Sequence, residues 1–399
     1  MIPRLKPALG HEELVAALRF SSSRDIEDFE ASFAAKMDSR FAVAFPYGRT
    51  GLLLLLEVLG IREKEVIVPA YTCVVVPHAV VYSGNRPVFV DSQLSDFNMD
   101  LGRIPDVVTR NTGAIVATSI FGYPCDLDIL DEIRERLNDR IPIIQDCAHC
   151  FGAEWKGRAV RKAGVAAVYG LNISKVITSI FGGMVTTDDE RLYVSLRRLR
   201  DERVTLATWT KSFRRCLYLM AVYLAFTEWA YGAVITMERA GFLKRFTDYY
   251  DANCVDMPAD YLAGITSLEA RVGSANLQRY DDIVRRRRET AAFYFKNLQM
   301  EEFHLPPDVE GATYSHFVVR VPDRTRWLRQ CLTKGLQLGQ LIEYSIPELP
   351  AYGMNKPERF PVAAGFARTT INLPVWGDRK MAAEVARKIR EVHLEVSRK

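Results

Sequence analysis

An aspartate and a lysine stand at the ends of two apolar runs, 29 residues apart. Asp146 ends the run 141–146, and Lys175 follows the run 165–174. The spacing is about one strand–helix–strand unit, so we expect both side chains at the ends of neighbouring buried strands. A carboxylate and an amine placed in this way can hold the two ends of one flat cofactor. Pyridoxal phosphate (PLP) requires such a pair, a Schiff-base lysine and an anion beside its pyridinium nitrogen.

Each member of this pair has an expected role and an ordinary alternative. Lys175 is the candidate catalytic residue, because a lysine at the end of a buried run can have a lowered pKa and act as nucleophile and base. Asp146 is the candidate partner of the pyridinium nitrogen, where its carboxylate would keep the ring protonated. Considered alone, Lys175 would be a surface residue and Asp146 a helix cap or turn residue. Their combination favours the cofactor interpretation.

Further residues could complete a PLP site. Gly48, Arg49 and Thr50 precede an apolar helix expected over 51–60. The N–H groups at a helix N-terminus bind phosphate, so these residues are expected to bind the cofactor. A helix start without a ligand is the alternative. His149 is expected to pack beside the cofactor ring or to hydrogen-bond its O3′, with a packed core histidine as the alternative.

The elements that must position these residues are short apolar strands separated by helices. We expect a helix at 126–137 and strands at 65–69, 87–91, 114–118, 142–145 and 166–170. Continuous apolar strands between helices indicate an α/β fold with a mainly parallel sheet that is covered on both faces. Ligands of such sheets bind at the carboxyl ends of the strands, where Asp91, Asp146 and Lys175 fall.

The pattern changes after about residue 255. The later elements are expected to be a long helix over 267–298, a strand at 314–321, a helix at 325–334, a strand at 369–373 and a helix at 378–396. The sequence therefore predicts a large PLP-binding domain over residues 1–255 and a smaller C-terminal α+β domain over 256–399.

Composition limits the classes of partner. The net charge of +4 over 399 residues gives no indication of nucleic-acid binding. The four arginines at 285–288 favour a solvated helix face over a binding patch. The seven cysteines are scattered, and the stretch 147–150 lacks the further ligands of a zinc site, so we expect neither disulfides nor a metal. The start of the chain lacks a secretory signal, so a cytoplasmic location is expected.

Residues 216–237 do not fit this plan, since they form an apolar segment with a single charge, Glu228. The segment is long enough to cross a bilayer, but a single crossing would separate the two halves of the enzyme. Basic residues flank it, including Lys244 and Arg245. Two interpretations stay open: a membrane-surface or re-entrant element at the inner face of the membrane, or a buried helical pair at a subunit interface.

Several stretches together carry a family resemblance. Lys175 stands seven residues before Gly182-Gly183. The other stretches are 45–52, 65–72, 84–91, 144–153, 335–338 and 371–374. From about residue 41 to its end the chain resembles the DegT/DnrJ/EryC1/StrS family of PLP-dependent sugar aminotransferases, of fold type I. An insertion interrupts the resemblance at about 205–250.

The resemblance implies a homodimer with active sites at the subunit interface. It implies glutamate as the usual amino donor, and a keto sugar, usually nucleotide-linked, as the acceptor. Lys175 would be the general base of the proton shift between them. In the smaller domain it implies that His316 and Tyr344 bind the substrate.

Some expected contacts of the family are changed in this chain. The changed positions are Tyr47, Arg49, Cys73, Gly170 and Gly264. Cys73 stands where the family has the aromatic residue stacked on the PLP ring, and Gly170 where it has a serine that binds the phosphate. Gly264 stands where the partner subunit supplies an asparagine or arginine. Arg49 and Asn172 are the candidates to supply the lost phosphate contacts.

The first hypothesis is therefore a PLP-dependent aminotransferase for a keto sugar of cell-envelope or glycan biosynthesis. The alternative is a fold type I PLP enzyme that acts on a lipid-linked or other non-nucleotide substrate at the membrane surface. A non-catalytic scaffold with the same fold is a third hypothesis. The presence of both Asp146 and Lys175 argues against it.

Overall fold

A seven-stranded sheet forms the centre of the computed structural model, which describes residues 1–137, 139–239, 250–353 and 357–397. In order across the sheet, the strands are β1 (Phe41–Phe45), β9 (Gly183–Thr187), β8 (Ala166–Gly170), β5 (Ile143–Asp146), β4 (Thr112–Thr118), β2 (Glu65–Pro69) and β3 (Arg86–Val90). Strand β9 runs antiparallel to both of its neighbours, whereas the five strands from β8 to β3 are parallel. The predicted α/β fold with a mainly parallel sheet is confirmed.

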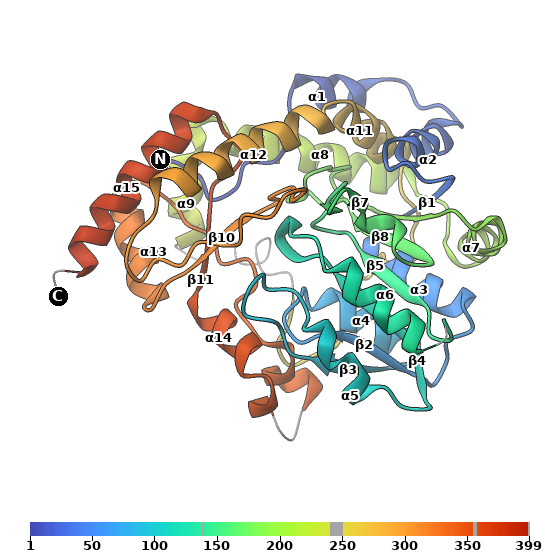
Figure 1. The fold of residues 1–399 in the computed structure, drawn as a ribbon. Coiled ribbons are helices and arrows are strands. Elements are labelled where there is room, and N and C mark those ends of the chain that lie inside the picture. Colours follow the sequence, from blue (N-terminus) through green and yellow to red (C-terminus); the bar gives the residue numbers. More distant parts are fainter. Residues whose placement is uncertain (138, 240–249, 354–356, 398–399) are drawn as a thin grey trace.

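Helices cover both faces of this sheet, which explains the continuous apolar runs in its strands. On one face lie α3 (Gly48–Val58) and α4 (Val75–Tyr82), and on the other lies α6 (Leu127–Arg136) (Figure 1). Neighbouring strand residues alternate between two cores: Ile144 of β5 packs with α3 and α4, while Ile143 packs with α6.

The later part of the chain contains a two-stranded antiparallel sheet and long helices. Its elements are α11 (Ser267–Gln278), α12 (Tyr280–Asn297), β10 (Phe317–Arg320), α13 (Arg324–Thr333), α14 (Pro361–Thr369), β11 (Thr370–Leu373) and α15 (Arg379–Ser397). One core cluster includes Leu54 of α3, Trp327 of α13 and Phe366 of α14. The two parts of the chain therefore pack together closely, and the domain boundary near residue 255 stays a prediction.

The single helix predicted over 267–298 is wrong, because Arg279 separates two helices. This residue ends α11 and begins α12. Helix α11 packs against α1 (His11–Leu18) and α2 (Asp25–Lys36), whereas α12 reaches α15 (Figure 1). The break follows from these different packing partners, and the Arg279 guanidinium pairs there with the buried Glu13 of α1 at 2.8 Å.

Short elements complete the described chain. They are α5 (Ile104–Val107), the hairpin of β6 (Glu154–Trp155) and β7 (Arg158–Ala159), and six short 3-10 turns: Leu101–Arg103, Ile120–Gly122, Val160–Lys162, Ile346–Glu348, Pro350–Tyr352 and Pro357–Arg359. The start of the chain packs against the segment just before α15, because Trp376 Nε1 donates a hydrogen bond to the carbonyl of Pro3 at 3.0 Å.

The apolar segment forms two helices that follow α7 (Glu190–Arg203). They are α8 (Trp209–Ala225) and α9 (Glu228–Arg239). Among the described residues, no single helix has the length and apolarity to cross a membrane. Trp209–Ala225 and Ala230–Met237 pass that test only together, as a pair bent by 108°. The flanking Lys244 and Arg245 lie outside the described residues.

One face of α8 is packed and the other is open. Leu219 is fully buried in a small core with residues of α1 and α11. The opposite face carries exposed apolar side chains at helical spacing: Trp209, Phe213, Leu217, Met220 and Leu224. We call these five residues the α8 stripe. The segment is therefore not a helical pair buried within its own chain.

Candidate active site

Three parallel strands bring the predicted pair to one edge of the sheet. Thr118 at the end of β4 lies opposite Asp146 at the end of β5, and β8 follows on the other side. Lys175 belongs to the turn after β8. A Cβ added at Gly170 would lie 3.5 Å from Cε of Lys175 and 3.7 Å from Cβ of Ala148. The lysine side chain therefore passes Gly170 toward the segment that follows Asp146.

Asp146 is a buried carboxylate with two hydrogen bonds. One oxygen accepts from the N–H of Ala148 at 3.1 Å, and the other from the hydroxyl of Thr118 at 3.2 Å. Burial raises the pKa of Asp146, while these hydrogen bonds and the nearby Lys175 oppose the rise. Such a carboxylate is stabilised by a cation brought to it, for example a protonated ring nitrogen.

Lys175 carries an amine without a fixed partner. Among the described residues it makes no hydrogen bond or ion pair through that amine. Burial lowers the pKa of Lys175, and the nearby Cys73 and Asp146 oppose the shift. A lowered pKa increases the uncharged fraction of the amine, which is the form that acts as nucleophile and base.

His149 is held in one orientation by the loop after β4. Its Nδ1 accepts a hydrogen bond from the backbone N–H of Phe121 at 3.2 Å, and the two rings stack with centroids 5.9 Å apart. Burial lowers the pKa of His149 well below its usual value, so the ring is neutral at pH 7. The proton of the neutral ring is then on Nε2, which can donate a hydrogen bond.

His316 lies next to His149, with ring centroids 5.3 Å apart. It comes from the loop before β10, whose backbone bonds to the loop after β4: the N–H of His316 donates to the carbonyl of Phe121 at 3.2 Å. Burial and the nearby Arg287 lower the pKa of His316 well below its usual value. The structure thus places His316 beside His149, and its role in substrate binding stays a prediction.

The arginine run at 285–288 is not a wholly solvated face, which corrects the prediction. Arg285 and Arg286 are exposed and pair with Asp282. Arg287 is buried and donates to the carbonyl of Ser315, and burial lowers the pKa of Arg287 to about 10. Because a helix turns by 100° per residue, consecutive residues cannot share one face.

The start of α3 is packed tightly against β8 and β9. A Cβ at Gly183 would lie 2.2 Å from the nitrogen of Gly48, and a Cβ at Gly48 would lie 2.8 Å from the carbonyl oxygen of Tyr169. Only glycines allow this approach, which explains Gly48 and Gly183, and Gly182 beside it has a positive φ of 125°. Thr50 is fully buried, and its hydroxyl donates to the carbonyl of Tyr261 at 2.8 Å.

Of the remaining predicted residues, Cys73 lies near the lysine with Tyr344 beside it, whereas the side chain of Asn172 is bonded within its own turn. Cys73 is near both Lys175 and Arg49, since its charge state affects the pKa of each. Tyr344 lies beside Cys73, because its hydroxyl accepts from the N–H of Val74 at 3.0 Å. Asn172 is exposed, and its side-chain oxygen accepts from the hydroxyl of Ser174 at 2.7 Å. Asn172 is therefore occupied within its own turn.

Thr118, Phe121 and Arg287 were not predicted as site residues. Thr118 could have been predicted, because it ends a strand that was expected next to the strand of Asp146. The ends of neighbouring parallel strands lie at one edge of the sheet. Phe121 has a positive φ of 57° and Arg287 acts through Ser315. These features depend on tertiary packing.

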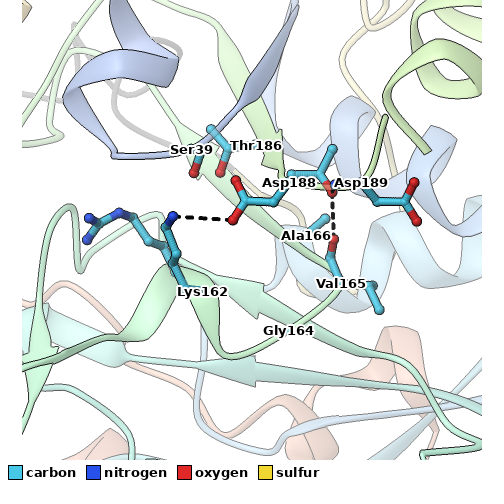
Figure 2. A pocket seen from close by; sticks show the side chains of 10 residues that line it. Ser39, Lys162, Gly164, Val165, Ala166, Thr186, Asp188 and Asp189 are labelled. Atoms are coloured by element: carbon cyan, nitrogen blue, oxygen red, sulfur yellow. Dashed lines mark hydrogen bonds and ion pairs between the residues drawn. The ribbon is translucent and has the colours of Figure 1, made fainter. Parts of the chain in front are cut away.

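A separate pocket lies away from these residues. It has a volume of about 190 Å³ and is lined by residues near the start of β8 and the end of β9, including Ser39, Lys162 and Asp188. Figure 2 shows Lys162 paired with Asp188, with nitrogen and oxygen 3.3 Å apart. Since Lys175 follows the other end of β8, this pocket is not part of the candidate site. No cluster that could hold a metal ion occurs among the described residues.

Comparisons with known proteins identify the family. The model of the DegT/DnrJ/EryC1/StrS aminotransferase family matches residues 11–392. The chain belongs to this family. GDP-perosamine synthase of Escherichia coli O157:H7 is 29% identical over 361 residues, which cover 89% of this chain and 85% of that protein. The dTDP-3-amino-3,6-dideoxy-alpha-D-galactopyranose transaminase of Aneurinibacillus thermoaerophilus is 26% identical over 357 residues, or 88% and 85% of the two chains.

The fold of this DegT family member matches solved structures. Spr1654 of Streptococcus pneumoniae, solved in its PLP form, aligns with a TM-score of 0.79 at 22% identity, over 99% of each chain. A likeness at this identity shows the fold. The chain is a PLP-dependent aminotransferase of its family.

The side chains at the sheet edge fit this cofactor. PLP offers a ring nitrogen, an aldehyde and a phosphate. The site offers the buried carboxylate of Asp146 for the ring nitrogen and the unpaired amine of Lys175 for the aldehyde. These are the two groups that PLP chemistry requires.

Proposed function

We propose that this enzyme transfers an amino group from glutamate to the keto group of a nucleotide-linked sugar, in cell-envelope or glycan biosynthesis. The observation that carries the proposal is the meeting of Asp146 and Lys175 at one sheet edge in a member of an aminotransferase family. The names of two relatives, which contain GDP and dTDP sugars, support a nucleotide-linked acceptor.

Each residue of the pair has a distinct task in this proposal. When bound, PLP carries the amine and draws electrons from the reacting carbon. Asp146 keeps the ring nitrogen protonated. Lys175 takes a proton from one carbon and returns it to the next, which its lowered pKa favours. Neutral His149 donates a hydrogen bond from Nε2 to the cofactor.

The substrate is proposed to enter beside His316 and Tyr344. His316 lies 5.3 Å from His149 between ring centroids, so a sugar there would meet both imidazoles. Tyr344 lies next to Cys73, where its hydroxyl accepts from the N–H of Val74. Two copies of the chain are proposed to form a homodimer. Gly48, Thr50 and Asn172 are proposed to lie around the cofactor as backbone or turn residues.

Mass spectrometry can test the reaction directly. The purified enzyme is incubated with PLP, isotopically labelled glutamate and a panel of nucleotide-linked keto sugars. We expect one sugar to gain the labelled amine, and Lys175→Ala to lose this activity by about 10²- to 10⁴-fold or more. Lys162→Ala is the matched control, because Lys162 lies at the other end of the sheet. Absence of any aminated product, with PLP bound, would argue against a nucleotide-linked acceptor.

The α8 stripe favours a second candidate function, amination of a lipid-linked substrate at the cytoplasmic face of a membrane. Its aromatic and aliphatic side chains are exposed, and the basic Arg214 beside them is exposed too. Such a surface fits an anionic lipid interface.

Liposome flotation separates the two candidates. The wild-type protein should float with anionic vesicles, and Phe213→Glu/Leu217→Glu should stay at the bottom. Val194→Glu is the control, since Val194 is an exposed apolar residue of α7 outside the stripe. No flotation of the wild type would remove this candidate and leave the stripe as a subunit contact.

A further inference from the structure

Arg49 is a cation at the start of α3, and the charges of Cys73 and Asp256 act on it without direct pairing. Among the described residues it makes no hydrogen bond, ion pair or ring contact. It is half-buried, and burial lowers the pKa of Arg49. By contrast, Arg215 nearby pairs with Asp260 at 2.9 Å and with Glu269 at 3.0 Å. An arginine held from water without an acceptor is a binding group for an anion.

The residues on both sides of Arg49 are held by hydrogen bonds that do not involve Arg49. The helix start is therefore anchored without the guanidinium. The hydroxyl of Tyr47 donates to Asp260 at 2.6 Å. The hydroxyl of Thr50 donates to the carbonyl of Tyr261 at 2.8 Å. One segment, 260–261, therefore fastens the helix start at two points. Neither anchor uses the guanidinium of Arg49 or its backbone N–H.

Arg49 lies on the same side of the sheet as Lys175. The backbone of Gly48, its neighbour, packs against Gly170, and Gly170 adjoins Cε of Lys175. Cys73 is close to both cations, since it influences the pKa of each. A ligand held by Lys175 can thus extend toward Arg49.

We infer that Arg49 binds the phosphate group of the cofactor through its guanidinium and its backbone N–H at the start of α3. This inference rests on the proposed function. The other candidate phosphate ligands are already occupied or absent: Asn172 bonds to Ser174, Thr50 bonds to Tyr261, and Gly170 has no side chain. The diphosphate of a nucleotide sugar has similar chemistry, so the test must distinguish the two sources.

The test compares ligands with and without the phosphate. Dissociation constants of PLP and of pyridoxal are measured by absorbance for wild type, Arg49→Gln and Arg49→Lys. We expect Arg49→Gln to weaken PLP binding by about 10- to 100-fold, the loss of one charge-assisted contact. Arg49→Lys should be intermediate, and pyridoxal should bind all three equally. Arg62→Gln is the control, because Arg62 is exposed near the other end of α3.

Each other outcome has a clear meaning. Unchanged PLP affinity in Arg49→Gln overturns the inference. Equal losses for PLP and pyridoxal also overturn it, since the pocket as a whole is then disturbed. A raised KM for the nucleotide sugar at unchanged PLP affinity assigns Arg49 to the substrate and overturns it as well. If the wild type itself fails to bind PLP, the proposed function fails instead.

Discussion

Asp146 places a carboxylate where burial disfavours its charge. Burial raises the pKa of Asp146, and only two hydrogen bonds and a nearby amine oppose the shift. In the protein without its cofactor, the charged form is therefore a cost to folding. We interpret this strain as the consequence of a site built to receive a protonated ring.

The first prediction concerns Asp146→Asn. Without cofactor, the variant should melt about 1–3 °C above the wild type at pH 8, because it removes a buried charge while its amide oxygen still accepts a hydrogen bond. A raised folded-state pKa contributes stability only at low pH and loses it as pH rises through that pKa. The advantage of the variant should therefore grow from pH 4 upward. Thermal unfolding of both cofactor-free proteins from pH 4 to 8 measures it.

Asp128→Asn is the control with the opposite sign. Hydrogen bonds from Lys156 and Trp155 lower the pKa of the exposed Asp128, so its contribution to stability is lost as pH falls. That variant should be less stable than the wild type at pH 8, and the difference should vanish in acid. A melting temperature of Asp146→Asn below that of the wild type at every pH would contradict the account of the site.

At the scale of the element, α8 is joined to the start of α3 by a buried ion network. The guanidinium of Arg215 contacts Glu269, Asp260 and the hydroxyl of Tyr47, and it lies over the ring of Phe181. Tyr47 is the N-cap residue of α3. Tyr47 therefore links α8 to the start of α3.

The second prediction is that Arg215→Met lowers the free energy of unfolding by about 3–5 kcal/mol, because it leaves Glu269 buried without its cation. Arg215→Met/Glu269→Gln should recover part of this loss. Denaturant titration provides the measurement. Arg198→Ala, which removes an exposed pair with Glu202, should cost less than about 0.5 kcal/mol. Equal costs for Arg215→Met and Arg198→Ala would show that the network does not hold α8.

Strands with a continuous apolar run could be predicted from the sequence, because a strand that is buried on both faces has apolar residues at every position. The run ending at Gly170 gave the strand β8 with its bounds. The antiparallel β9 was missed because its place depends on pairing with β1, a long-range contact. The break at Arg279 depends on separate packing partners, which local sequence does not specify.

The candidate site divides in the same way. Asp146 and Lys175 could be found because strand ends and spacing place them. Phe121 and Arg287 could not, since both act through backbone contacts with residues far along the chain. From the sequence alone, Asn172 and Arg49 are equal candidates for binding the phosphate. Asn172 is occupied because its side-chain oxygen accepts from the N–H of Ser174 within its own turn.

At the scale of the molecule, the α8 stripe is an apolar surface that a stable protein in water would cover. Either a second copy of the chain or a lipid surface could cover the stripe. Charged substitutions on the stripe would break the dimer in the first case and lipid binding in the second. The third prediction is that the wild type has twice the mass of one chain by light scattering. Phe213→Glu/Leu217→Glu should keep this mass if lipid covers the stripe. A shift to the mass of one chain would assign the stripe to the subunit interface.

The claim that Lys175 is the residue joined to PLP has the most direct test. The PLP-loaded protein is reduced with borohydride and digested, and the modified peptide is identified by mass spectrometry. The account predicts a cofactor label on Lys175 alone, and none there after prior incubation with glutamate. A label on another lysine, or an unlabelled peptide containing Lys175 in PLP-loaded protein, would contradict it.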